Sequence, residues 1–305
     1  MPNKHFDFIG KRKIFYIFSS IIIIVGLISF FTQGMNKGID FTGGNIIQIS
    51  FNKDVSVADI RTIVEKYTDV TPSIKATNDN EYSIRTADMS EDKNTAMLAE
   101  MKQTLDTKEV LRNDRIGPVI GEELISNAMW ALGIALVLML IYITVRFQFY
   151  FAIAAIVPLI HDVLFVVGLF SLFQVEIDST FVAAILTIIG YSIIGTVVVF
   201  DRIRENMRIT SKDGIAVITN NSINETLGRT INTVVAVVIL VLALLFLGGE
   251  STRSFCLALF IGFATGAYTS IFIAGGILTD LITHFGDDSK KSKSGAKNKT
   301  AKALK

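Results

Sequence analysis

Six long segments of this sequence contain almost no charged residues. They cover residues 14–33, 125–145, 149–173, 181–200, 228–248 and 254–279. Each is long enough to cross a bilayer as a helix, which needs about 20 apolar residues. Charged residues make up only 19% of the chain, too few for an ordinary soluble protein of this length. The sequence therefore predicts a membrane protein whose main part is an all-α bundle of six transmembrane helices.

Lysine and arginine residues collect on one side of the predicted bundle. They are frequent in residues 1–13, in the amphipathic loop 201–226 and in the tail 280–305, which has seven lysines. A short connection on the other side carries Glu176 instead. Because basic residues accumulate in cytoplasmic loops, we expect both termini in the cytoplasm and residues 34–124 outside it. The tail is predicted to be a solvated, disordered end near anionic lipids rather than a nucleic-acid-binding patch.

Residues 34–124 change to short alternating segments, which indicate a folded domain in water. The predicted strands cover residues 45–51, 73–77, 82–86 and 108–115, and the predicted helices cover residues 56–67 and 90–105. Ser90 fits the N-cap of the second helix. The order strand, helix, strand, strand, helix, strand predicts one small α+β domain of the ferredoxin-like type.

Two glycine-rich motifs flank this domain. GIDFTGG contributes Gly38, Asp40, Phe41, Gly43 and Gly44, and RIGPVIGEEL contributes Gly117, Pro118 and Gly121. Paired glycines suit the sharp turns by which a chain leaves and re-enters a membrane. A phosphate-binding loop is disfavoured, because the required lysine and following helix are missing. Asp40, Glu122 and Glu123 are interpreted as solvated caps rather than as metal ligands.

His161 and Asp162 lie near the centre of the third predicted helix, close to Pro158, a candidate bend. An ionisable residue inside a bilayer costs several kcal/mol unless it is paired or hydrated, so this pair is a candidate functional site. Neighbouring residues of a helix point about 100° apart. We therefore predict that His161 and Asp162 do not serve each other and that each has a partner on another helix. The pair is either a proton relay, since imidazole titrates near neutral pH, or a structural group that fixes helix packing.

No arrangement of residues points to bond-making chemistry. The chain has three histidines, none with the spacing of a zinc-binding H-E-x-x-H motif, and it has no nucleophile elbow or phosphate loop. Cys256 is the single cysteine, so no intrachain disulfide can form. We therefore expect no enzyme activity, no metal site and no cofactor.

The remaining features of the membrane segments have both functional and structural interpretations. Gly262 and Gly266 belong to a stripe of small residues, which is typical of close helix packing within the chain or against a partner subunit. Arg229 is either a snorkelling interfacial arginine or a cation that faces the bundle. The fourth helix runs into an interfacial cytoplasmic motif formed by Asp201, Arg202, Arg204, Glu205 and Asn206. Its arginines would meet lipid phosphates or cytoplasmic acids, and its acids can pair with nearby arginines.

Five motifs follow one another along the chain. They are GIDFTGG, RIGPVIGEEL, the His161 and Asp162 pair, GYSIIGTVVVFDRIREN and ETLGRTINT. Together they resemble the SecF family of protein translocase subunits, part of the SecD/SecF family in the RND superfamily. The resemblance runs from the first predicted helix through the sixth. It implies a six-helix half of an RND-type bundle, completed by SecD, with one extracytoplasmic domain.

The resemblance also implies a function and partners. It implies a heterodimer with SecD in the bacterial cytoplasmic (inner) membrane, beside the SecYEG channel, with YajC and YidC as further candidate partners. The complex would use a proton or sodium gradient to assist late stages of export of an emerging preprotein, in contact with membrane lipids and without nucleic acid. An RND-type exporter subunit for lipid or solute, and an uncoupled structural assembly factor of the translocon, are the alternatives.

One departure from the family pattern affects the expected ion site. Members of the family carry an Asn-Asp pair where this chain has Ile194 and Gly195, and the aspartate couples ion movement, while the family's partner arginine matches Arg229. Asp201 cannot replace the missing carboxylate, because six residues along a helix separate the two positions by about 9 Å. Either SecD supplies the carboxylate, which we favour, or Asp162 with His161 carries the ion, or the chain is a weakly coupled scaffold.

Overall fold

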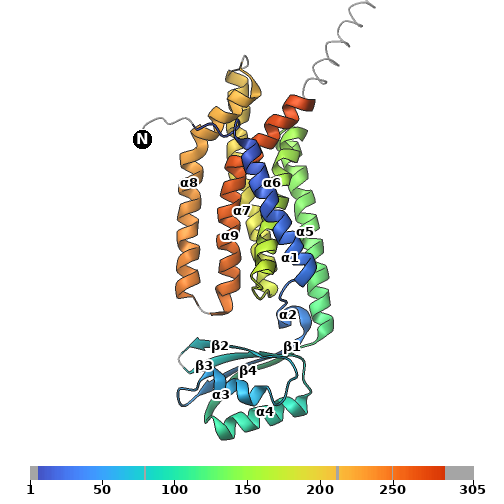
Figure 1. Ribbon diagram of the computed structural model, residues 1–305, viewed down its shortest axis with the longest axis vertical. Coiled ribbons are helices and arrows are strands. Elements are labelled where there is room, and N and C mark those ends of the chain that lie inside the picture. Colours follow the sequence, from blue (N-terminus) through green and yellow to red (C-terminus); the bar gives the residue numbers. More distant parts are fainter. Residues whose placement is uncertain (1–5, 79, 211–212, 249, 286–305) are drawn as a thin grey trace, which may run out of the picture.

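The computed structural model describes residues 6–78, 80–210, 213–248 and 250–285. The predicted segments 1–13, 201–226 and 280–305 lie partly outside these described residues. Within these residues, six helices are long and apolar enough to cross a membrane, as predicted, and they form one bundle with a small sheet domain at one end (Figure 1). The chain is therefore a multi-pass membrane protein.

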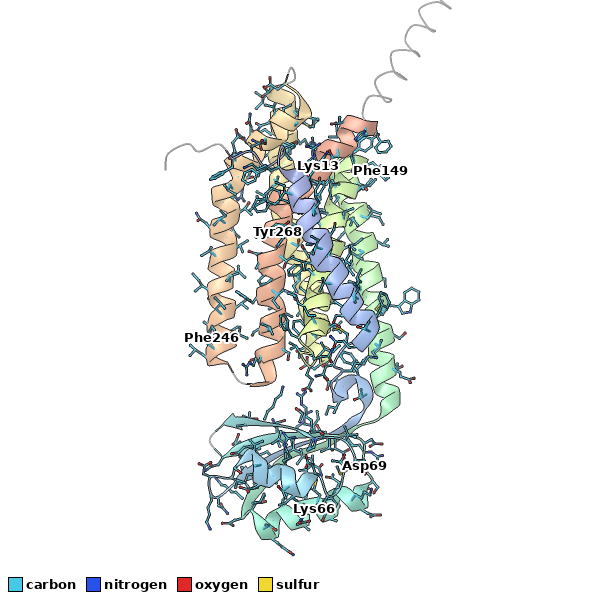
Figure 2. The ribbon with its side chains drawn as sticks, in the orientation of Figure 1. Lys13, Lys66, Asp69, Phe149, Phe246 and Tyr268 are labelled. Carbon is cyan, nitrogen blue, oxygen red and sulfur yellow. The ribbon has the colours of Figure 1, made fainter. Side chains whose placement is uncertain are left out.

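The six bundle helices present apolar surface outward. They are α1 (Arg12–Gln33), α5 (Pro118–Arg146), α6 (Phe149–Leu172), α7 (Ser179–Ile209), α8 (Ile215–Leu247) and α9 (Glu250–Phe272). After a turn at Ile273, helical residues 274–285 continue α9. Figure 2 shows Phe149 and Phe246 projecting from the bundle, and their side chains are 60% and 79% exposed. Such exposed apolar side chains suit contact with lipid rather than water.

Several helices begin or end at residues other than the predicted ones. The segment 201–226, predicted as a loop, is mostly helical, because α7 continues to Ile209 and α8 begins at Ile215. No glycine or proline follows Phe200 before the end of α7, and Arg202 pairs with Glu205 on the helix surface at 2.7 Å, which stabilises the extra turns. α5 begins at Pro118, well before residue 125, because proline fits the first turn of a helix.

Small residues of α9 allow close contact with α7. A Cβ atom on Gly262 would lie 2.3 Å from the side chain of Ile188 in α7. A Cβ atom on Gly266 would lie 3.2 Å from the side chain of Ser192, also in α7. The stripe of small residues is therefore an internal helix contact.

The sheet domain lies between α1 and α5 in the sequence. Its elements are β1 (Gly44–Phe51), α3 (Val57–Val64), β2 (Ser73–Asn78), β3 (Glu81–Thr86), α4 (Glu91–Thr104) and β4 (Thr107–Ile116). The strands form one antiparallel sheet in the order β2-β3-β1-β4. α3 and α4 cover the face of the sheet that points away from the bundle (Figure 1). Ile47, Ile60, Ile84 and Met97 are fully buried, so the domain has a core of its own.

Candidate functional site

Asp162 lies where three helices of the bundle meet. The residue is 1% exposed. Its Oδ2 accepts hydrogen bonds from Ser192 Oγ of α7 at 2.6 Å and from Thr269 Oγ1 of α9 at 3.1 Å. A buried carboxylate needs such donors in place of water. Hydroxyl groups can also accept a hydrogen bond, so the same surroundings suit Asp162 with or without a proton.

His161 contacts Asp162 directly, and the prediction that these neighbours cannot serve each other is wrong. His161 Nδ1 lies 3.3 Å from Asp162 Oδ1. Both side chains leave the buried side of α6, and rotation about their side-chain bonds closes the angle between them. The expectation of partners on other helices holds for Asp162. For His161, the buried Nε2 has no hydrogen-bond partner among the described residues.

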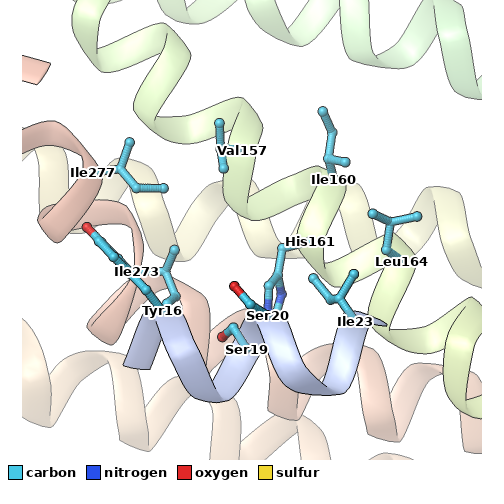
Figure 3. Close-up of a pocket in the computed structure, with 10 residues that line it drawn as sticks. All are labelled: Tyr16, Ser19, Ser20, Ile23, Val157, Ile160, His161, Leu164, Ile273 and Ile277. Atoms are coloured by element: carbon cyan, nitrogen blue, oxygen red, sulfur yellow. The ribbon is translucent and has the colours of Figure 1, made fainter. Parts of the chain in front are cut away.

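A cavity of about 330 Å³ borders the ring of His161. Figure 3 shows the ring pointing from α6 toward Ser19 and Ser20 of α1. Ile273 and Ile277, which follow α9, close another side. The cavity is mainly apolar, and the imidazole and the serine hydroxyls give it a polar wall.

The end of this cavity nearest the start of α1 carries charged groups. Tyr16 lines the cavity, and its hydroxyl donates to Asp280 Oδ2 at 3.3 Å. Arg12 forms an ion pair with Asp280 Oδ1 at 2.8 Å. These three residues lie at the end of the bundle opposite the sheet domain, where Lys13 is labelled in Figure 2. A polar cluster thus stands between that end and His161.

Gly195 and Arg229 line a second cavity, of about 90 Å³, between α7 and α8. Thr230 also lines it, and its buried Oγ1 has no hydrogen-bond partner among the described residues. Arg229 is exposed and forms none of the ion pairs found in the described part of the chain. No acidic residue lines this cavity. The structure thus brings Gly195 and Arg229 together, without a carboxylate between them.

The interfacial motif at the end of α7 joins three helices. Arg202 binds Glu205 in its own helix and Glu225 in α8. Asn206 Nδ2 also donates to Glu225, at 2.9 Å. Asp201 lies 3.3 Å from Arg146 Nη2 at the end of α5, and Arg204 donates to the carbonyl oxygen of Arg146 at 3.0 Å. The motif therefore fixes helix ends and lies away from the cavity beside Gly195.

The first glycine-rich motif connects the bundle to the sheet domain. Asp40, in the short helix α2 (Ile39–Thr42), accepts hydrogen bonds from the backbone N–H and the hydroxyl of Ser179 at the start of α7. Gly38 N–H donates to the carbonyl oxygen of Ile177 at 2.8 Å. Gly44 has φ 152° and lies so close to Thr86 that a Cβ atom would be 2.3 Å from its carbonyl oxygen. Glycine is therefore required there.

The two glycine-rich motifs also contact each other. A Cβ atom on Gly121 of α5 would lie 2.4 Å from the carbonyl oxygen of Phe41, which is buried. Gly43 has φ 75°, a conformation that favours glycine. Gly117 is extended and precedes Pro118, the first residue of α5. Both motifs therefore shape the junction where the chain passes between the bundle and the domain.

Glu176 makes a second connection between the bundle and the domain. It lies in the turn between α6 and α7 and pairs with Arg85 of β3 at 3.0 Å and with Lys75 of β2 at 3.7 Å. A cavity of about 590 Å³ beside it is lined by residues of both parts, among them Gly38 and Arg85. Among the described residues, no group of three or more His, Cys, Asp or Glu side chains could hold a metal ion.

Sequence reasoning missed several residues of this site. Ser192 and Thr269 were not singled out, although hydroxyl residues within apolar helices are the signal that points to them. Tyr16 and Asp280 are far apart in the sequence, so no local pattern links them to His161. Glu176 was used only to assign the side of the membrane on which its loop lies, because its basic partners belong to the sheet domain and are distant in the sequence.

Two family models match the chain. Protein export membrane protein SecD/SecF, C-terminal, matches residues 96–284, and the SecD/SecF GG motif matches residues 28–55. The protein translocase subunit SecF of Sebaldella termitidis is 39% identical over 95% of this chain and 96% of its own length. The SecF of Haemophilus influenzae is 38% identical over 92% of this chain and 87% of its own length.

Solved structures of SecDF have the same fold. The crystal structure of SecDF from Thermus thermophilus, a translocon-associated membrane protein, has a TM-score of 0.82 and 33% identity, and the match covers 92% of this chain. SecDF in a super-membrane-facing form has a TM-score of 0.73, 32% identity and 97% coverage. This chain spans 39% and 41% of those two longer chains. From its sequence relatives and from this fold, the chain belongs to the SecF family of protein translocase subunits.

Proposed function

We propose that this chain pairs with SecD and uses an ion gradient to assist late stages of SecYEG-dependent protein export. The observation that carries the proposal is Asp162, a carboxylate buried among three helices beside an imidazole and two hydroxyl groups. An ionisable group at this depth is costly and commonly marks an ion or proton pathway. The relatives named protein translocase subunit SecF and the SecDF structures support a role in export.

We propose that the membrane is the bacterial cytoplasmic (inner) membrane, with both termini in the cytoplasm. Arg12 and Lys13 begin α1, and Arg202 and Arg204 belong to the last turns of α7; the start of α1 and the end of α7 both lie at the end of the bundle away from the sheet domain (Figure 1). The basic residues favour the cytoplasm for this end. The sheet domain, whose element order is typical of a ferredoxin-like fold, then faces the emerging preprotein outside.

Asp162 is the proposed carrier of the coupling ion, with a proton as the simplest candidate. Its two hydroxyl donors and the adjacent imidazole support proton uptake and release, and the protein needs no cofactor or catalytic group for this step. A second candidate is a carboxylate of SecD that enters the cavity beside Gly195. The guanidinium of Arg229 lines that cavity and forms none of the ion pairs found among the described residues, which favours this candidate.

The variant Asp162→Asn tests the main proposal, because it keeps the size of the side chain and removes its charge. We expect export from cells or vesicles that contain SecD and SecYEG to lose its dependence on the gradient. Asp213→Asn, at an exposed acidic residue between α7 and α8, is the matched control and should retain it. Unchanged gradient dependence in Asp162→Asn would exclude Asp162 and leave the SecD carboxylate as the carrier.

Movement of the bundle is proposed to reach the sheet domain through Glu176 and the first glycine-rich motif. Ser73 Oγ lies 3.5 Å from Glu176 Oε2, so a short bis-methanethiosulfonate cross-linker between cysteines at both positions can lock β2 to the turn between α6 and α7. We expect the locked protein, in a Cys256→Ala background, to stop export and to recover after the cross-link is reduced. Export that continues while the cross-link is intact would contradict this mechanism.

The proposed partners are SecD, SecYEG and the preprotein, with YajC and YidC as further candidates. Copurification of SecD distinguishes this proposal from an exporter of lipid or solute, which has no reason to bind SecD. An uncoupled assembly factor of the translocon would also bind SecD, but its effect on export would not change when the gradient is collapsed.

A further inference from the structure

The ring of His161 has one nitrogen that the protein leaves without a partner. Nδ1 faces Asp162, whereas Nε2 is buried and unpaired among the described residues. The residue is only 7% exposed and lines the cavity of about 330 Å³ between α1, α6 and the helical residues after α9 (Figure 3). A buried polar atom without a partner costs about 1 to 3 kcal/mol, so a polar molecule in the adjacent cavity would stabilise Nε2.

Water is the occupant that fits this cavity best. A lipid tail would fill the apolar wall but would leave Nε2 unpaired. A water molecule occupies roughly 30 Å³ in the liquid, so the cavity has room for several. The hydroxyls of Tyr16 and Ser20 line the same space and can bind these molecules, which typically need two to four polar partners.

The cavity extends toward a polar cluster at one end of the bundle. In the proposed orientation, this end faces the cytoplasm. Tyr16 lines the cavity and donates to Asp280 at 3.3 Å, and Asp280 pairs with Arg12. The Asp280 side chain is 33% exposed, so solvent can reach it. The titratable and charged groups near the path are Arg12 and Tyr16 on α1, Asp162 on α6, Tyr268 on α9 and Asp280 in the helical residues after α9.

We propose that this cavity is a water-filled half-channel through which a proton passes between the Asp280 end and His161. For inward flux, Asp162 Oδ1 gives its proton to Nδ1, while Nε2 gives its own proton to a water molecule that passes one on toward Asp280. The ring stays neutral in its other tautomer, and rotation of the side chain, which turns Nδ1–H to the cavity and Nε2 to Asp162, resets the relay for the next proton. This inference rests on the proposed role of Asp162 as the carrier, and it assigns to His161 the proton transfer between Asp162 and the cytoplasmic side.

Cysteine labelling measures the water content of the cavity without any export assay. The complex with SecD carries Cys256→Ala and either Ser20→Cys, which lines the cavity, or Ile21→Cys, at a residue that is 56% exposed on α1 and does not line it. A charged methanethiosulfonate reacts only with a hydrated thiolate, so we expect Ser20→Cys to react at least ~10-fold faster than Ile21→Cys. Equal rates at the two neighbouring positions would overturn the proposal.

Proton flux tests the role of His161. His161→Gln keeps hydrogen-bonding groups but cannot titrate, and we expect it to reduce inward proton flux in vesicles by ~10-fold or more and to flatten its pH dependence. His284→Gln, at an exposed histidine near the end of the described chain, is the control and should match the wild type. A wild-type pH profile in His161→Gln would overturn the half-channel.

The two proposals fail in different ways. If Asp162→Asn leaves the gradient dependence unchanged, the proposed carrier is wrong, and the half-channel, which rests on it, falls with it. If Asp162→Asn abolishes the dependence while Ser20→Cys is unreactive and His161→Gln is normal, only the half-channel is wrong. Tyr16→Phe, which removes the hydroxyl but retains the ring, should slow the flux without changing labelling at position 20.

Discussion

Introducing a carboxylate by Gly195→Asp tests how tightly Gly195 of α7 packs against Ser270 of α9. A Cβ atom at this position would lie 2.9 Å from Ser270 Oγ, so the serine side chain must rotate. That rotation breaks its 3.1 Å hydrogen bond with Thr196 and costs about 1 kcal/mol. Replacing glycine within a helix recovers about the same amount. The backbone and steric effects should therefore nearly cancel, and Gly195→Ala should leave the free energy of unfolding almost unchanged.

The new carboxylate would also enter the cavity that Arg229 lines. Residues that contact each other show coupling energies of about 0.5 to 3 kcal/mol. We expect at least ~1 kcal/mol here, because the two side chains would share one small cavity and the described residues offer Arg229 no other carboxylate. Export should keep its gradient dependence unchanged if Asp162 already carries the proton.

A double-mutant cycle measures this coupling. The free energy of unfolding in mixed micelles is compared for the wild type, Gly195→Asp, Arg229→Gln and the double variant, with Gly195→Ala as the steric control. A coupling energy near zero would refute the geometry of the shared cavity. If Gly195→Ala lowers the free energy of unfolding by more than ~3 kcal/mol, the Ser270 side chain cannot rotate away from a Cβ atom at position 195, and the reasoning above is refuted. A large gain of gradient-dependent export in Gly195→Asp would show that the chain is normally weakly coupled.

Three further predictions concern packing and the sheet domain. Gly262→Leu should destabilise the bundle by about 1 to 3 kcal/mol, measured by unfolding in mixed micelles, because even a Cβ atom at this position would overlap the side chain of Ile188. Met97→Ala should cost about 2 to 5 kcal/mol in the domain, measured by hydrogen exchange of α4, because Met97 is fully buried. Hydrogen bonds from Lys66 and Tyr67 hold the pKa of Glu100 below its usual value, so this contribution to stability is complete above about pH 4.3 and is lost as the pH falls through the lower folded-state value. Thermal unfolding against pH should show this loss in the wild type and not in Glu100→Gln.

The bundle could be predicted because each helix carries its own signal. An uncharged run of sufficient length identifies a membrane helix without knowledge of its neighbours, and the strands and helices of the domain follow from local periodicity and caps such as Ser90. The continuation of α7 to Ile209 was missed because charged residues ended the apolar run. An apolar run shows which part of a helix lies in the bilayer and does not show where the helix ends. The helix continues as long as backbone hydrogen bonds and pairs such as Arg202 with Glu205 stabilise it.

The candidate site was only partly predictable, because its contacts join distant parts of the chain. The sequence identified His161 and Asp162 by their cost in a membrane. It could not identify Ser192, Thr269 or Asp280 as neighbours, because these depend on the packing of α6, α7 and α9. The orientation of the His161 ring depends on side-chain rotation, which the spacing of residues along a helix does not determine.

The contact of Glu176 with the sheet limits how the domain can swing. The domain is joined to the bundle by the chain that leaves α1 and by the chain that enters α5, and a body held at two points can rotate about the line between them. The pairs from Glu176 to Arg85 and Lys75 add a third point off that line. While these pairs persist, rotation about that line would stretch them, so a tilt of α6 and α7 against α1 would turn the domain together with these helices.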